Sequence, residues 1–195
     1  MKEKMNTKSE NFYDFVIVHG SFGWPFENWF PWLADELAAK GKKVLAPQFP
    51  CGKGMQNYEN WYRVLDAYAP FIGEKTTFIG HSLAPAFIVD YLLDRQIKVN
   101  ALYFVAPLYQ KCNHPEVDEV NASFFFKSDL KDITTLSQKR ICFISTNDPY
   151  VPNDYSLDFA KKIGAEVKTV ENAGHFNTAA GYRTCPLLLQ QLSEA

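Results

Sequence analysis

The sequence lacks the cysteine clusters that bind metal ions or build disulfide frameworks. Its four cysteines lie far apart with no CxxC pair, and its four histidines do not join them at zinc-ligand spacing. These residues are Cys51, Cys112, Cys142 and Cys185, and His19, His81, His114 and His175. We therefore expect free thiols, no structural metal and no cofactor.

Long apolar runs are also missing. No stretch is long enough to span a bilayer, and residues 1–10 are polar, without the apolar core of a signal peptide. We expect a cytoplasmic protein with no membrane partner, in which residues 1–10 form a disordered tail. The remaining residues, 11–195, have a length that suits one domain.

Neither sign of charge dominates. Twenty Lys and Arg residues against 22 Asp and Glu residues give a formal charge of −2, and no basic run is dense enough to follow a phosphate backbone. We expect no nucleic-acid partner, and the composition identifies no protein partner. A hydrophobic fraction of 47% is typical of a folded globular protein.

Short runs rich in Val, Ile and Phe alternate with amphipathic stretches of helical length. The sequence predicts strands near residues 15–18, 43–46, 76–79, 101–105, 140–145 and 166–170. It predicts helices over about residues 28–39, 57–68, 83–93, 153–163 and 186–192, with Asn153 as an N-cap. This alternation predicts an α/β fold, a doubly wound parallel sheet with helices on both faces.

Residues 109–138, between the fourth and fifth predicted strands, are too many for a plain crossover. The segment carries Phe124, Phe125 and Phe126. Two interpretations stay open: a small helical cap over a pocket, or an elaborated loop that packs its aromatic side chains into the main core.

The pentad Gly80-His81-Ser82-Leu83-Ala84 falls where an apolar strand gives way to an apolar helix. A serine on so sharp a turn projects its hydroxyl clear of the sheet, as a nucleophile must. Taken alone, the pattern also fits an ordinary turn serine or a helix N-cap. Residues at other strand ends favour the nucleophile.

Ligands of doubly wound sheets bind outside the carboxyl ends of the strands. Asp148 follows the fifth predicted strand and His175 the sixth. Ser, Asp and His in this chain order, each at a strand end, are the arrangement of α/β-hydrolases. We predict Ser82 as nucleophile, His175 as its general base and Asp148 as the carboxylate that orients His175. Glu171 is the weaker candidate for that last role, and Asp148 alone could simply open a turn before Pro149.

A tetrahedral intermediate needs backbone N–H donors for its negative charge. Leu83 N–H, at the start of the helix after the turn, is the predicted first donor. The second is predicted from the loop after the first strand, from Ser21, with Phe22 as the alternative. Phe22 and Trp24 are candidates for the wall of a pocket that favours small, apolar acyl groups. His19, which begins this loop, is expected to bond the backbone and shape it.

Five segments together resemble the small serine hydrolases of the retinoblastoma-binding protein 9 and YdeN type, a minimal branch of the α/β-hydrolases. They are residues 16–20, 28–33, 80–84, 147–152 and 174–176. The resemblance implies a six-stranded parallel sheet of order 2-1-3-4-5-6, with Ser82, Asp148 and His175 as the triad. It also implies hydrolysis of small esters, while some members act on amide-like substrates or on amino-acid esters.

Two departures from the family pattern stand out. Ala84 occupies a position where the turn more often has glycine. No cysteine lies in the Leu-x-Cys-x-Glu motif that binds the retinoblastoma protein, so that partner is not carried over.

These observations lead to one hypothesis with two alternatives. The chain is expected to be a serine hydrolase that cleaves a small-molecule ester through an acyl-serine intermediate. The alternatives are an amide or thioester hydrolase with the same triad, and a binding protein that keeps the fold with an idle triad.

Overall fold

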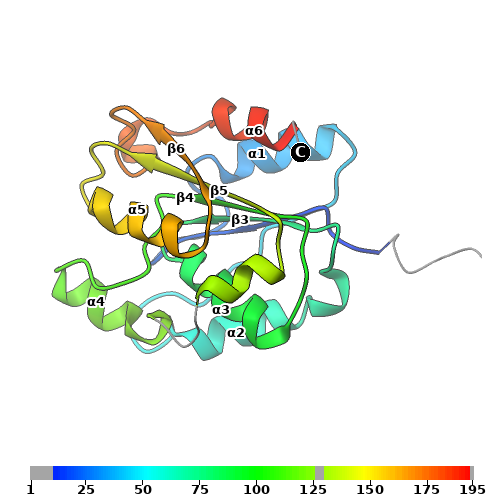
Figure 1. Cartoon of the computed structure of the whole chain (residues 1–195), viewed down its shortest axis with the longest axis horizontal. Coiled ribbons are helices and arrows are strands. Elements are labelled where there is room, and N and C mark those ends of the chain that lie inside the picture. Colours follow the sequence, from blue (N-terminus) through cyan, green and yellow to red (C-terminus); the bar gives the residue numbers. More distant parts are fainter. Residues whose placement is uncertain (1–10, 126–129, 194–195) are drawn as a thin grey trace, which may run out of the picture.

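A six-stranded, all-parallel sheet forms the centre of the computed structural model, which describes residues 11–125 and 130–193 (Figure 1). The strand order is β2-β1-β3-β4-β5-β6. The strands are β1 (Phe15–Val18), β2 (Val44–Leu45), β3 (Thr77–His81), β4 (Ala101–Val105), β5 (Lys139–Ser145) and β6 (Glu166–Val170). The predicted fold class and strand order are confirmed. The predicted tail, residues 1–10, lies outside the described residues.

Helices cover both faces of the sheet. They are α1 (Phe30–Ala39), α2 (Tyr58–Asp66), α3 (Ala84–Arg95), α4 (Pro115–Asn121), α5 (Asn153–Lys162) and α6 (Pro186–Ser193). Figure 1 shows α1 and α6 on one face and α2 and α3 on the other. The buried apolar residues accordingly form two large clusters, one with side chains of α1 and α6 and one with side chains of α2, α3 and α5. None of the described helices combines the length and the apolar character needed to cross a bilayer.

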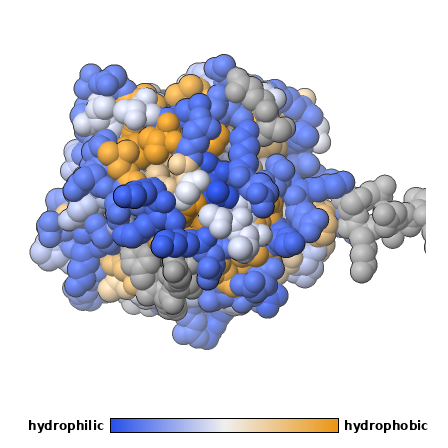
Figure 2. Space-filling model, in the orientation of Figure 1, coloured by the Kyte–Doolittle hydropathy of each residue, from blue (hydrophilic) through white to orange (hydrophobic). Residues whose placement is uncertain are grey.

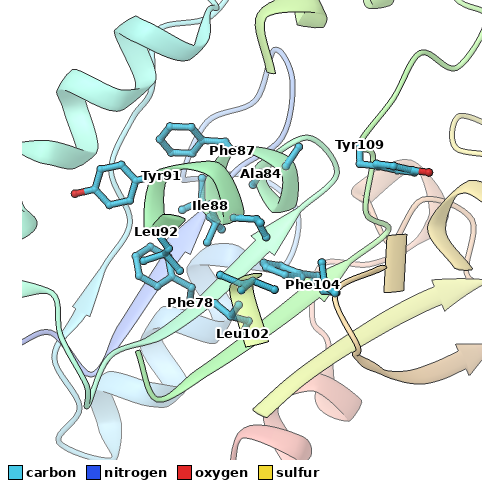
Figure 3. Packing of buried hydrophobic residues seen from close by; sticks show 14 of the residues in the cluster. Phe78, Ala84, Phe87, Ile88, Tyr91, Leu92, Leu102, Phe104 and Tyr109 are labelled. Atoms are coloured by element: carbon cyan, nitrogen blue, oxygen red, sulfur yellow. The ribbon is translucent and has the colours of Figure 1, made fainter. Parts of the chain in front are cut away.

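Helix α3 is the most deeply buried helix, since every residue from Ala84 to Leu93 is buried. Figure 3 shows Phe87, Ile88 and Leu92 of this helix above Phe78 of β3 and Leu102 of β4. A helix that is apolar nearly all round suits such a place, because neighbours cover it on every side. The rigid contact of α3 with the two central strands holds the turn between β3 and α3 in position.

The predicted helix starts at Asn153 as expected, but its predicted N-cap residue is wrong. Pro152, not Asn153, occupies the N-cap position of α5. The Asn153 side chain donates instead to the carbonyl oxygen of Ser145, at 2.8 Å. The Asn153 amide therefore ties the first residue of the helix to the end of β5.

The segment over residues 109–138 contains α4 and two short 3₁₀ helices, η2 (Ala122–Phe124) and η3 (Leu130–Thr135). Phe124 is fully buried, with its ring centroid 4.9 Å from that of Trp61. Other residues of the segment line the cavity described below. Phe126 lies outside the described residues.

Candidate active site

Ser82 occupies the sharp turn between β3 and α3 with a φ of +59°. This left-handed conformation costs a non-glycine residue about 1–3 kcal/mol, so the surrounding structure must hold it. The Ser82 N–H donates to the carbonyl oxygen of Val105 at 2.9 Å, and the Ser82 carbonyl accepts from Leu108 N–H at 2.7 Å. Both backbone groups are thus tied to β4 and the loop after it, leaving the side chain free to project from the sheet.

Two glycines provide the space that this turn needs. A Cβ on Gly20 would lie 2.7 Å from Ser82 Cβ and 3.3 Å from Ser82 Oγ. A Cβ on Gly80 would lie 3.3 Å from Ala84 Cβ and 2.8 Å from Ile88 Cδ1. The methyl group of Ala84, unusual at its position, therefore fits because Gly80 has no side chain.

His175 and Asp148 meet across the ends of β5 and β6. His175 Nδ1 lies 2.7 Å from Asp148 Oδ2, and the Asp148 side chain is only 5% exposed. The other carboxylate oxygen, Oδ1, accepts from the N–H groups of Tyr150 and Val151 at 2.9 and 3.1 Å. Asp148 therefore opens a turn with one oxygen and faces His175 with the other. Because an ionised carboxylate only accepts, Nδ1 carries the proton and His175 Nε2 is left as an acceptor.

Glu171 does not compete for this place. It is exposed, and its carboxylate accepts from Thr146 Oγ1 at 3.2 Å. Among the described residues, Asp148 supplies the carboxylate hydrogen-bonded to His175.

Hydrogen bonds from distant residues fix the loop that carries His175. His81 Nε2 donates to the carbonyl oxygen of His175 at 2.8 Å, and Trp29 Nε1 donates to that of Phe176 at 3.0 Å. Asn147 Oδ1 accepts from Gly174 N–H at 2.8 Å and so joins this loop to the one that carries Asp148. Sequence reasoning missed all three bonds. The partners of the first two are 94 and 147 positions apart, and no local pattern marks them.

His19 holds the loop after β1, as predicted. Its Nδ1 donates to the carbonyl oxygen of Gly20 at 2.8 Å, and its Nε2 accepts from Phe49 N–H at 3.0 Å. Burial lowers the pKa of His19 to about 4. Burial, assisted by the neighbouring His175, lowers the pKa of His81 to about 3. Both rings are therefore neutral near pH 7 and serve as hydrogen-bonding braces.

These lowered pKa values predict that acid destabilises the fold. A neutral buried histidine stabilises the protein in full above its unfolded pKa of about 6.5, and that stability is lost as the pH falls toward the folded value. Between pH 7 and pH 5, His19 and His81 are each expected to remove about 2 kcal/mol from the free energy of unfolding. Denaturant unfolding at several pH values measures this change.

A matched pair of variants separates these histidines from other acid effects. His81→Gln should reduce the loss of unfolding free energy between pH 7 and pH 5 by about 2 kcal/mol. The control His114→Gln changes an exposed histidine and should keep the wild-type slope. Equal slopes in the wild type and His81→Gln would contradict the prediction.

Ser82 and His175 line the same cavity of about 430 Å³, and each residue is 8% exposed. The loop after β1 contributes Ser21 and Phe22 to the lining, and the segment over residues 109–138 contributes Cys112 and Val117. Within the described part of the chain, Ser82 Oγ makes no hydrogen bond. Contacts between a nucleophile and its base are often long until substrate binds.

Of the two aromatic candidates for the pocket wall, Phe22 lines this cavity and Trp24 does not. Both side chains are about half exposed, at 52% for Phe22 and 53% for Trp24, and the Trp24 ring lies 6.1 Å from that of Phe26. Side chains in this loop leave it in different directions, which the sequence does not reveal.

Figure 2 shows a mostly hydrophilic face with apolar side chains gathered near its upper left.

The backbone donors beside Ser82 differ in their availability. Among the described residues, neither Leu83 N–H nor Ser21 N–H has a hydrogen-bond acceptor. Phe22 N–H, the alternative second donor, is occupied, because it donates to Gln56 Oε1 at 2.8 Å. The free donors are therefore the two that the sequence analysis preferred.

Comparison with known proteins identifies the family of this chain. A family model described as serine hydrolase matches residues 15–194. The chain belongs to the serine hydrolase family. YdeN of Bacillus subtilis (strain 168) is 26% identical to this serine hydrolase over 180 residues, which cover 91% of this chain and 93% of YdeN.

Two solved structures are also similar to this chain. The crystal structure of the B. subtilis ydeN gene product matches this serine hydrolase with a TM-score of 0.81 and 25% identity, covering 92% of this chain and 96% of the other. A YdeN-like protein from Pectobacterium atrosepticum matches with a TM-score of 0.69 and 19% identity, covering 96% and 91%. The second likeness concerns the α/β-hydrolase fold alone.

No cluster of three or more His, Cys, Asp or Glu side chains suited to a metal ion occurs among residues 11–125 and 130–193. The four cysteines are unpaired thiols. Burial raises the pKa of the Cys112 thiol, which lies in the cavity lining. A raised pKa disfavours the thiolate, so Cys112 is not suited to act as a nucleophile.

Proposed function

We propose that this serine hydrolase cleaves small carboxylic esters through an acyl-serine intermediate. Ser82 is the nucleophile, His175 the general base and Asp148 the group that orients His175. The observation that carries the proposal is the 2.7 Å bond between His175 Nδ1 and Asp148 Oδ2, made at the edge of the cavity that Ser82 also lines. Such a bond leaves Nε2 free to accept a proton on the cavity side.

The reaction begins when His175 Nε2 takes the proton of Ser82 Oγ, which attacks the ester carbonyl carbon. The carbonyl oxygen becomes an oxyanion that accepts from Leu83 N–H and Ser21 N–H. As the intermediate collapses, the bond to the alcohol oxygen breaks, and His175 returns the proton to that oxygen. Water, deprotonated by His175, then releases the acid and restores Ser82.

The size and lining of the cavity favour a small acyl group. A volume of about 430 Å³ lies at the lower end of the range for ligand pockets. Its apolar lining includes Leu108, Val117 and Val151. An apolar wall binds an acyl chain but offers few partners for a charged one.

Two measurements test the proposal. A fluorophosphonate probe should label the wild-type protein covalently, and p-nitrophenyl esters of rising chain length should be cleaved fastest at short lengths. No labelling and no ester cleavage would overturn the proposal. Labelling together with cleavage of amides or thioesters only would keep the triad and replace the substrate class.

Gly20→Ala is expected to lower kcat for p-nitrophenyl acetate at least about 100-fold. The added methyl group would lie 2.7 Å from Ser82 Cβ and displace either the serine or the loop that carries Ser21 N–H. Gly73→Ala is the matched control, since the three atoms nearest to its Cβ would all belong to the ring of Phe12. Wild-type kcat in Gly20→Ala, with unfolding unchanged, would contradict this account of the turn.

A further inference from the structure

A buried chain of hydrogen bonds joins helix α4 to the loop after β1. Asn121, the last residue of α4, is fully buried, and its Oδ1 accepts from Ser21 Oγ at 2.9 Å. The same oxygen accepts from Gln56 Nε2 at 2.6 Å. Figure 1 shows α4 on the side of the molecule toward which β5 and β6 point.

Gln56 extends this chain to the backbone of the loop. It is 2% exposed, and its Oε1 accepts from Phe22 N–H at 2.8 Å. Phe22 has a φ of +56°, a conformation that a bulky residue adopts only when its surroundings hold it. Asn121 and Gln56 therefore hold the two residues that flank the peptide group between Ser21 and Phe22.

The orientation of the Asn121 amide is set by its neighbours. Gln56 Oε1 is engaged by Phe22 N–H, so the Gln56 amide nitrogen faces Asn121, which must offer an oxygen. As a result Asn121 Nδ2 is buried with no hydrogen-bond partner among the described residues. Leaving a buried donor unpaired is unfavourable, and an apolar side chain would avoid it. The value of Asn121 therefore lies in its acceptor oxygen.

We propose that Asn121 is a positioning residue for the oxyanion hole, acting through Ser21 and Gln56. The inference rests on the proposed function, in which Ser21 N–H is one of the two oxyanion donors. Asn121 does not line the cavity and touches no reacting atom. Asn121 binds the Ser21 side chain directly and reaches Phe22 N–H through Gln56. These bonds fix the path of the loop, so that Ser21 N–H keeps one direction and stays free of other acceptors. The segment over residues 109–138 thereby serves catalysis without supplying a reacting group.

Asn121→Leu tests this role, since leucine has a similar size and no acceptor. The loop then loses one anchor, so Ser21 N–H should stabilise the oxyanion less well while ground-state binding is kept. For p-nitrophenyl acetate we expect kcat to fall at least about tenfold and KM to change less than about twofold. A trifluoromethyl ketone, which forms an oxyanion on Ser82, should bind more weakly by the same factor as the loss in kcat/KM.

Two further variants keep the test decisive. Ser21→Ala removes the same hydrogen bond from its half-buried end. It should lower kcat several-fold, and it serves as the test if Asn121→Leu does not fold. The matched control is Ser123→Ala: Ser123 Oγ accepts from Tyr58 N–H at 3.0 Å, so it ties the same segment to α2 but not to the loop. Ser123→Ala should keep wild-type kcat.

The outcomes separate this inference from the proposed function. A wild-type protein that neither hydrolyses esters nor reacts with a fluorophosphonate removes both. An active wild type whose kcat is unchanged in Asn121→Leu or Ser21→Ala overturns the positioning role alone. An equal loss of kcat in Ser123→Ala also overturns it, because general loosening of the segment would then account for the effect.

Discussion

Replacement of Ser82 by alanine is expected to abolish labelling by a fluorophosphonate and to lower kcat for p-nitrophenyl acetate on the order of 10⁶-fold. The substitution deletes the only oxygen that can form the acyl-enzyme in the proposed reaction. The hydrogen bonds that hold the turn, to Val105 O and from Leu108 N–H, come from the Ser82 backbone and remain in the variant. The fold should therefore survive, and any loss reports on chemistry.

Ser21 is the matched control for this experiment, since it also lines the cavity. Ser21→Ala should still be labelled, more slowly than the wild type, and mass spectrometry should place the adduct on Ser82. Equal labelling of the wild type and Ser82→Ala would remove Ser82 from the reaction. In the wild type, an adduct on Ser21 in place of Ser82 would have the same consequence.

The second large effect is expected from Asp148→Asn, which should lower kcat by about 10⁴-fold, as the same change does in serine proteases. The oxygen of the new amide can keep the bonds from Tyr150 N–H and Val151 N–H, but its NH₂ group then faces His175 Nδ1. His175 must accept there, so its proton moves to Nε2. A protonated Nε2 cannot take the proton of Ser82, although the geometry is unchanged.

Glu171→Gln provides the matched control, because Glu171 is an acidic residue at the end of the neighbouring strand with no bond to His175. It should keep kcat within about twofold of the wild type. Steady-state kinetics with p-nitrophenyl acetate and a thermal unfolding curve measure both variants. If Glu171→Gln lost activity and Asp148→Asn did not, the orienting role would pass to Glu171.

The sequence predicted the elements well where local rules dominate. The six strands follow from short runs of β-branched and aromatic residues, and their observed ends differ from the predicted ones by at most two residues. The places of Ser82, Asp148 and His175 followed from the same pattern, since parallel strands bring their carboxyl ends to one edge. The prediction of Asn153 as an N-cap is wrong because a tertiary contact overrides the local preference. The Asn153 side chain donates to the Ser145 carbonyl oxygen and does not cap α5.

Sequence alone thus determined the α/β fold and the chain order of the three residues at strand ends, because hydrophobic periodicity and turn chemistry are local properties. Tertiary structure alone decided which side chains brace them. Asn121 meets Ser21 across 100 positions, and Trp29 meets the His175 loop across 147. It also placed Phe22, but not Trp24, in the lining of the cavity. These contacts depend on loop paths set by packing of the whole chain, and no short stretch of sequence encodes them.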